Sequence, residues 1–218
     1  MSKDDDRDFF RGEKAREEIA KTFSVVQIAH YINLSEKPVK SVFRDDLQEI
    51  FIIELVGKKD ENNRQSYVVG STVAESLFRL TDQKAIPLFH PFLSDAKKSS
   101  SSKPSPGQSV TNTGKPRTPL NEELYQALNI VLSIYGYNRP EGLFARLLVE
   151  VRDQFPNYDV KEFKIRNFDK ALKKFNRTLY DLIADLKKRH PDLRSFSFPL
   201  MEEILGPESS IGKPLSSS

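Results

Sequence analysis

The sequence of 218 residues contains no cysteine, which excludes a disulfide framework, a thiolate metal site and a cysteine nucleophile. Its three histidines, His30, His90 and His190, lie far apart in the sequence and match no metal-ligand spacing. The 9 glycines are scattered and form no glycine-rich phosphate loop. Serines abound only in segments without a scaffold to position a nucleophile. We therefore expect no catalytic activity and no cofactor or bound metal.

Long apolar runs are also missing. The longest run, residues 50–53, is far shorter than the roughly 20 residues that a membrane-spanning helix needs. The first residues, Met1 to Asp6, are polar and lack the apolar core of a secretory signal. We therefore expect a soluble, cytoplasmic protein that does not associate with membranes.

The charges of the whole chain nearly cancel, because 34 lysines and arginines face 31 aspartates and glutamates, for a formal net charge of +3. An anionic partner would therefore have to bind a local patch of positive charge. Residues 1–95 carry 14 basic and 17 acidic side chains, whereas residues 161–194 carry 11 basic and 5 acidic ones. The second segment is the one marked concentration of charge in a part of the chain that is expected to fold.

A change of composition divides the chain. Residues 96–118 are rich in serine, proline and lysine, and they contain five basic residues and no acidic one. Such a segment cannot bury enough apolar surface to offset the entropy of ordering, so it predicts a disordered linker. The linker separates an N-terminal domain, residues 8–95, from a C-terminal domain, residues 119–206. Residues 207–218 are expected to form a flexible tail.

The pattern of the N-terminal domain favours an α+β fold. Apolar residues at helical spacing predict helices over residues 15–23, 25–32, 39–47 and 72–80. Two β-rich segments, residues 49–56 and 66–69, flank a polar loop and predict a hairpin. Three helices followed by a hairpin is the order of a winged helix-turn-helix. We therefore predict a mainly α protein with a winged-helix-like N-terminal domain, in which residues 35–48 would be the recognition helix.

The charge of this candidate recognition helix is balanced. It sets three basic residues against three acidic ones, namely Lys37, Lys40 and Arg44 against Glu36, Asp45 and Asp46. Such a face repels phosphate nearly as much as it attracts it. We therefore expect the N-terminal domain to bind a protein partner or a second copy of the chain in preference to nucleic acid. The proline-broken apolar segment 86–93 is interpreted as a packing strap, or alternatively as a docking peptide.

The C-terminal domain is predicted to be helical. Asn121 and Pro140 are placed to begin two helices, and Asp159 is placed to cap a third segment in which Phe163 and Ile165 can point inward. Apolar residues at spacings of three and four then fit a single helix over residues 167–188. Alternatively, the helix breaks near residues 176–178.

Part of this domain resembles a known family. The run Phe155-Pro156-Asn157-Tyr158-Asp159-Val160-Lys161-Glu162-Phe163, with Phe168 to Leu172 after it, resembles the OST-HTH (LOTUS) domain over residues 124–175. That family usually has a glycine where this chain has Lys164, and it tends to finish with a β wing. The resemblance implies a compact winged-helix-like fold and RNA binding, whereas some members dock onto a helicase partner.

We therefore predict a non-enzymatic nucleic-acid-binding protein, with RNA preferred over DNA. Neutralised phosphates release counterions, and this gain supplies most of the affinity of a sequence-tolerant binder. The predicted contacts are Lys161, Lys164, Arg166, Lys170, Lys173, Lys174 and Arg177. Three tyrosines, Tyr137, Tyr158 and Tyr180, would stack on unpaired bases or pack in the core.

The alternative is an adaptor or assembly subunit, because lysine-rich helix faces are also ordinary solvated surfaces. Such a protein would carry two small helical modules on a flexible tether. It would bind its partner through an apolar segment, either residues 86–93 or residues 193–205.

Overall fold

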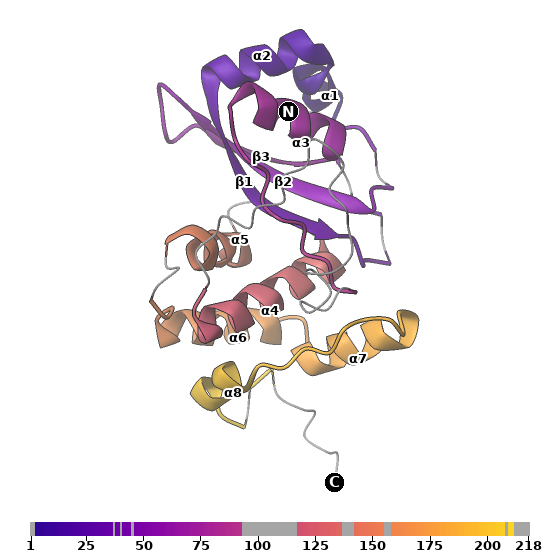
Figure 1. Ribbon diagram of the computed structural model, residues 1–218, viewed down its shortest axis with the longest axis vertical. Coiled ribbons are helices and arrows are strands. Elements are labelled where there is room, and N and C mark those ends of the chain that lie inside the picture. Colours follow the sequence, from indigo (N-terminus) through magenta and orange to yellow (C-terminus); the bar gives the residue numbers. More distant parts are fainter. Residues whose placement is uncertain are drawn as a thin grey trace, which may run out of the picture. The chain divides into compact units, whose positions relative to one another are not determined.

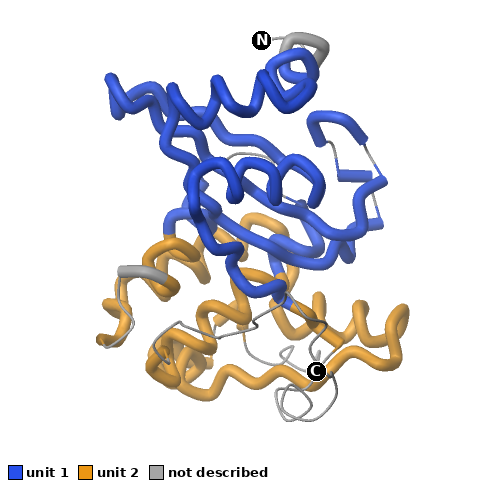
Figure 2. Tube along the Cα trace, turned by 45° about the horizontal axis from the view of Figure 1, so that its top comes forward, with its two compact units in different colours: residues 1–89, 131–146 blue, residues 90–130, 147–218 orange. Residues whose placement is uncertain are grey.

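The computed structural model describes most of the chain as an α+β protein with a small antiparallel sheet and a helical part. The described residues are 3–36, 38–39, 41–44, 46–92, 117–136, 142–154, 158–207 and 209–211. The chain divides into two compact units (Figure 2). Unit 1 comprises residues 1–89 and 131–146, and unit 2 comprises residues 90–130 and 147–218. Residues 96–116 of the predicted linker lie outside the described residues.

Unit 1 is built on an antiparallel sheet with the strand order β1-β2-β3. Its elements along the chain are α1 (Lys3–Phe10), α2 (Gly12–Thr22), β1 (Phe23–Ile32), β2 (Glu49–Gly57), β3 (Arg64–Val69) and α3 (Ser71–Leu80). Helices α2 and α3 lie on the same side of the sheet (Figure 1). The predicted hairpin is confirmed, because β2 and β3 pair on either side of the polar loop.

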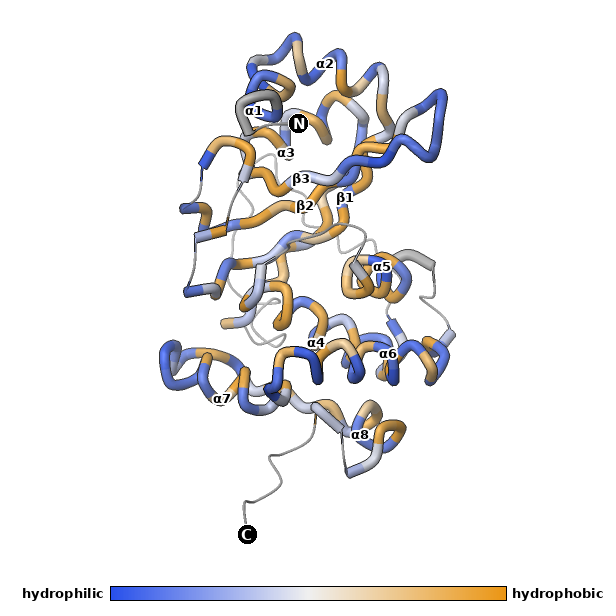
Figure 3. Tube along the Cα trace, turned by 180° about the vertical axis from the view of Figure 1, so that it is seen from behind, coloured by the Kyte–Doolittle hydropathy of each residue, from blue (hydrophilic) through white to orange (hydrophobic). Residues whose placement is uncertain are grey.

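The core of unit 1 is centred on β2. Phe51, Ile53 and Leu55 alternate along the strand and pack in one cluster with apolar residues of α2 and α3. Ile50 and Ile52 point to the other face and are also fully buried. Figure 3 shows the hydrophobic colour along β2 and the hydrophilic colour of the loop between β2 and β3. Burial on both faces explains why β2 reads as an unbroken apolar run.

The prediction of a helix over residues 25–32 is wrong, because these residues belong to β1. The β-branched residues Val25, Val26 and Ile28 favour a strand once a partner strand is available. The pairing with β2 shifts register between Gln27 and Ala29, and Ile28 and Ala29 are both buried. The irregularity interrupts the strict alternation of a strand and so imitates the spacing of a helix.

The described residues of the predicted recognition helix, 35–48, form no helix. Their backbone groups are bonded to other segments. The N–H of Val42 donates to the carbonyl of Val68 in β3, and the guanidinium of Arg7 donates to the carbonyl of Val42 at 3.3 Å. The element order of unit 1 therefore differs from the three helices and hairpin expected for a winged helix.

Residues 86–89 pack along β1, as the strap interpretation predicts. The N–H of Phe89 donates to the carbonyl of His30 at 2.8 Å, and the N–H of Ile86 donates to the side chain of Gln27 at 2.7 Å. The two ring nitrogens of His30 lie 2.9 Å from the carbonyl oxygen of Ile86 and 2.6 Å from a carboxylate oxygen of Glu49. The strap is therefore held by polar contacts as well as by the burial of Phe89.

The helical part of the chain contains six described elements, of which α4 and α5 contribute residues to both units. They are α4 (Pro119–Tyr135), α5 (Leu143–Val149), a π-helix (Glu150–Gln154), α6 (Glu162–Lys173), α7 (Leu179–Arg189) and α8 (Pro199–Leu205). Arg117, assigned to the linker by its composition, packs beside α4. Its guanidinium lies 2.9 Å from the carboxylate of Glu122 and over the ring of Tyr125.

Asn121 does not cap a helix, because α4 begins at Pro119 and the side chain of Asn121 is fully buried. Its amide nitrogen donates to the carbonyl of Tyr158, and its amide oxygen accepts from the N–H of Val160, both at 2.8 Å. Asn121 thus fixes the segment that leads into α6. Asp159, the predicted cap of that segment, is exposed, and Lys161 occupies the N-cap position without a side-chain hydrogen bond.

The C-terminal residues fold back into unit 2. The carboxylate of Glu123 accepts the N–H groups of Leu200 at 3.2 Å and Met201 at 2.9 Å, in the first turn of α8. Burial raises the pKa of the Glu123 carboxyl, although these two hydrogen bonds lower it in part. Ser210 and Ile211 are buried, so the prediction that the flexible tail begins at residue 207 is wrong for them.

The chain breaks between α6 and α7, as the second of the two predicted alternatives states. Asn176 has a positive φ of 51°, a conformation that asparagine tolerates better than most residues. Thr178 then forms a capping box with Asp181, in which each side chain accepts the backbone N–H of the other residue. This local signal outweighs the continuous apolar spacing.

We expect Asn121→Ala to lower the free energy of unfolding by about 2 kcal/mol, because it leaves the buried N–H of Val160 without an acceptor. Equilibrium urea unfolding followed by circular dichroism measures the change. The control is Asn167→Ala, which truncates an exposed asparagine of α6 and should change stability by less than about 0.5 kcal/mol. Equal stability of the two variants would contradict the assigned role.

Candidate nucleic-acid interface

Helix α6 carries most of the predicted contacts and is amphipathic. Ile165, Phe168 and Leu172 are fully buried, and their spacing of three and four places them on one face. The opposite face is exposed to solvent. The apolar spacing of the sequence therefore determines which side of α6 faces solvent.

A carboxylate on the buried side anchors the helix. Asp169 is only 6% exposed, and its Oδ1 accepts the N–H of Ser210 at 2.5 Å. Its other oxygen lies 3.0 Å from the ammonium of Lys173. A buried carboxylate needs such partners, because its charge is costly without them. The Lys173 pair lies within α6, whereas the Ser210 contact ties the buried side of the helix to the C-terminal segment.

Four of the seven predicted basic residues have a carboxylate partner. The ion pairs are Lys164–Glu150, Arg166–Glu162, Lys173–Asp169 and Arg177–Asp185. Hydrogen bonds from Arg177 and then Lys188 lower the pKa of the Asp185 carboxyl. The sequence-based expectation of seven available cations is therefore too high.

The pairs differ in burial. The side chains of Lys164 and Glu150 are 17% and 24% exposed and lie 2.5 Å apart, so this lysine is part of the structure of unit 2. Arg166 and Glu162 are well exposed and 3.6 Å apart. An exposed pair of this kind contributes about 0–1 kcal/mol, and phosphate can replace its carboxylate at little cost.

The other three residues, Lys161, Lys170 and Lys174, are exposed and form no ion pair with the described residues. Arg166, Lys170 and Lys174 follow one another at intervals of four, which places them in one row along α6. Lys161 precedes the first turn of the helix. The structure thus brings Arg166, Lys170 and Lys174 together on one side of α6, a smaller set of cations than the sequence predicts.

Two aromatic side chains lie exposed in the same segment. Phe163 is 55% exposed and Tyr158 is 74% exposed, so the expectation that Phe163 points inward is wrong. Phe163 precedes Lys170 by seven residues, or about two helical turns, and therefore lies on the same face of α6. The sequence pattern did not single out Phe163 as an exposed ring, although its spacing of two turns from Lys170 was a usable signal. Tyr137 lies outside the described residues.

Among the described residues, no group of three or more histidine, aspartate or glutamate side chains is placed to bind a metal ion. No helix in this part of the chain is long and apolar enough to cross a membrane.

Comparison with known proteins identifies a family. A family model described as "Uncharacterised conserved protein UCP028583" matches residues 53–210, which is more than half of the chain. No curated protein matches, and no solved structure matches.

We expect Lys164→Ala to lower the free energy of unfolding by about 1–2 kcal/mol, between the values for exposed and buried ion pairs, because it leaves Glu150 without its cation. Lys170→Ala is the matched control on the exposed face and should change stability by less than about 0.5 kcal/mol. Urea unfolding of both variants distinguishes a structural lysine from an available one. Identical midpoints would show that the Lys164 pair adds nothing.

Proposed function

The chain belongs to the family of uncharacterised conserved proteins UCP028583, and we propose that it binds single-stranded nucleic acid without catalysing a reaction. RNA is the preferred ligand, and the exposed face of α6 is the binding surface. The observation that carries the proposal is the row of Arg166, Lys170 and Lys174 beside the exposed ring of Phe163.

The electrostatic part of this proposal rests on solvent access. Lys161, Lys170 and Lys174 are exposed, and no carboxylate among the described residues pairs with them. Arg166 adds a fourth cation, because its exposed pair with Glu162 exchanges easily for a phosphate. Contacts with several phosphates release counterions, which gives an affinity that depends strongly on salt.

The aromatic part favours a single strand. A base stacks on an exposed ring only when it is unpaired, and each such stack contributes about 1–3 kcal/mol for any base. Phe163 lies among the cations and offers its ring at that place. A duplex would use the phosphate contacts alone and would leave the ring in water.

The preference for RNA draws on the resemblance to the OST-HTH (LOTUS) domain over residues 124–175. That resemblance stays a prediction. The described residues of this range form helices, and no strand among them supplies a β wing. The disordered linker and the cytoplasmic location likewise stay predictions.

The adaptor alternative has less support. Residues 86–89 pack on β1 of their own unit. In the segment 193–205, Leu193, Phe198 and Met201 are buried. The apolar segments proposed for partner binding are thus largely used inside the protein. Binding of a protein partner, or of a second copy, by the N-terminal half stays a prediction.

The first test is the salt dependence of RNA binding. In the variant Lys161/Lys170/Lys174→Ala, the slope of log affinity against log salt should fall by about 2, which is about 0.7 for each lost phosphate contact on a single strand. Fluorescence anisotropy of a labelled single-stranded RNA of about 20 nucleotides, long enough for a typical single-strand site, measures the slope.

The matched control is Lys14/Lys59/Lys84→Ala, which removes three exposed lysines from unit 1 and changes the net charge equally. It should leave the slope close to that of the wild type. Equal slopes in the two variants would show that RNA binding depends on the net charge of the protein and not on the face of α6. Absence of RNA binding at low salt would contradict the proposed function.

The second test is Phe163→Ala, which removes the exposed ring and leaves the cations in place. Affinity for single-stranded RNA should fall by about 5-fold to 150-fold, the value of one stacked base, with an unchanged salt slope. Phe43→Ala is the control, because Phe43 is 38% exposed in unit 1 and lies away from the proposed surface in the sequence. The stacking contact is refuted if both variants bind like the wild type.

A further inference from the structure

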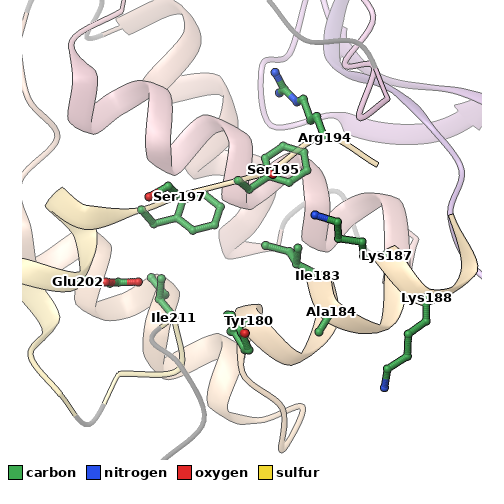
Figure 4. A pocket seen from close by; sticks show the side chains of 12 residues that line it. Tyr180, Ile183, Ala184, Lys187, Lys188, Arg194, Ser195, Ser197, Glu202 and Ile211 are labelled. Carbon is green, nitrogen blue, oxygen red and sulfur yellow. The ribbon is translucent and has the colours of Figure 1, made fainter. Parts of the chain in front are cut away.

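A second surface of unit 2 has features of a ligand site. A groove of about 580 Å³ opens beside α7, a volume within the range of about 300–1,000 Å³ that is usual for small-ligand sites (Figure 4). Tyr180 of α7 supplies an exposed aromatic ring, and Phe198 and Ile211 are apolar and buried. The guanidinium of Arg194 lies over the ring of Phe196, 4.7 Å from its centre. The lining is therefore suited to a flat apolar surface.

The charged groups of the groove lie toward different ends. Lys187 and Lys188 are in the last turn of α7, where Lys188 pairs with Asp185 at 3.2 Å, and Arg194 lies beyond the helix. Glu202 belongs to α8 and lies on the side of Ile211, away from these cations (Figure 4). Seven residues, or about 10 Å of helix, separate Tyr180 from Lys187. A fitting ligand thus carries negative charge at one end and hydrogen-bond donors at the other.

We propose that the groove holds one unstacked base of a bound RNA strand. The base stacks on Tyr180, a neighbouring phosphate lies near Lys187, and the amino edge of the base faces Glu202. This inference rests on the proposed function and adds to it a second contact that distinguishes bases. The amino groups of adenine, guanine and cytosine are donors that a carboxylate accepts, whereas uracil has a carbonyl in place of the cytosine amino group.

An acidic peptide fits the same groove less well. Its carboxylates would meet Lys187 and Lys188, but it would also bring negative charge toward Glu202. Glu202 is exposed and forms no ion pair with the described residues, so nothing among them neutralises it. A nucleotide carries its anionic group and its N–H donors on opposite sides and satisfies both ends.

The test compares oligo(rC) and oligo(rU) of equal length by fluorescence anisotropy on the full chain. The wild type should bind oligo(rC) about fivefold more tightly, the effect of one hydrogen bond of ordinary net strength. Glu202→Gln should abolish this preference. The control is Glu203→Gln, which removes the same charge from the next residue, outside the groove lining, and should keep it.

A second variant fills the groove. Ala184→Trp places a large ring among the lining residues and should weaken binding of both oligomers by about fivefold or more, the loss of one stacked base. Tyr180→Ala removes a ring without filling space and should give a similar loss. A loss shared by a variant that fills the groove and a variant that removes a ring from it, both with circular dichroism spectra like that of the wild type, would support a ligand in the groove.

The outcomes separate the two proposals. If the wild type binds neither oligomer, the proposed function fails and this inference fails with it. If binding depends on Lys161, Lys170 and Lys174 but is unchanged in Ala184→Trp, Tyr180→Ala and Glu202→Gln, the inference alone is overturned. It is also overturned if Ala184→Trp keeps its RNA affinity but loses binding of a glutamate-rich peptide, which would make the groove a peptide site.

Discussion

The buried carboxylate of Asp169 is the constraint on which the arrangement of unit 2 depends. A charge inside a protein is stable only with donors around it, and here the N–H of Ser210 and the ammonium of Lys173 provide them. The carboxylate lies on the buried side of α6, so its contact with Ser210 fixes the rotation of the helix about its own axis. The other face of the helix is exposed to solvent. The exposure of Lys170 and Phe163 therefore follows from the contact between Asp169 and Ser210.

The same logic sorts the basic residues into two kinds. Lys164 and Lys173 hold carboxylates of their own unit and so contribute to the fold. Lys161, Lys170 and Lys174 are exposed and pair with no carboxylate of the described residues. A count of charges along the sequence gives equal weight to both kinds, although only the second kind is available to a polyanion at no cost in stability.

Local signals were enough to predict the hairpin of unit 1 and the two-helix alternative for α6 and α7, because β-branched runs and capping residues act on their neighbours. The prediction failed where the determining partner is distant. The irregular pairing of β1 with β2 gives the strand an apolar spacing that resembles that of a helix. Asn121 reads as a helix cap, but its partners at Tyr158 and Val160 follow 37 and 39 residues later. At the site, the common face of Arg166, Lys170 and Lys174 could be predicted from their spacing in the sequence. The pairing of Lys164 with Glu150 could not, because it depends on how the chain folds.

The contacts of the last described residues have a consequence for synthesis. Glu123 receives its two N–H donors from α8, and Asp169 receives one from Ser210. Chains emerge from the ribosome beginning at the N-terminus, so these two acidic side chains are made long before their donors. Unit 2 is therefore incomplete until translation has passed residue 210. A nascent chain arrested earlier could not form the hydrogen bond between Ser210 and Asp169.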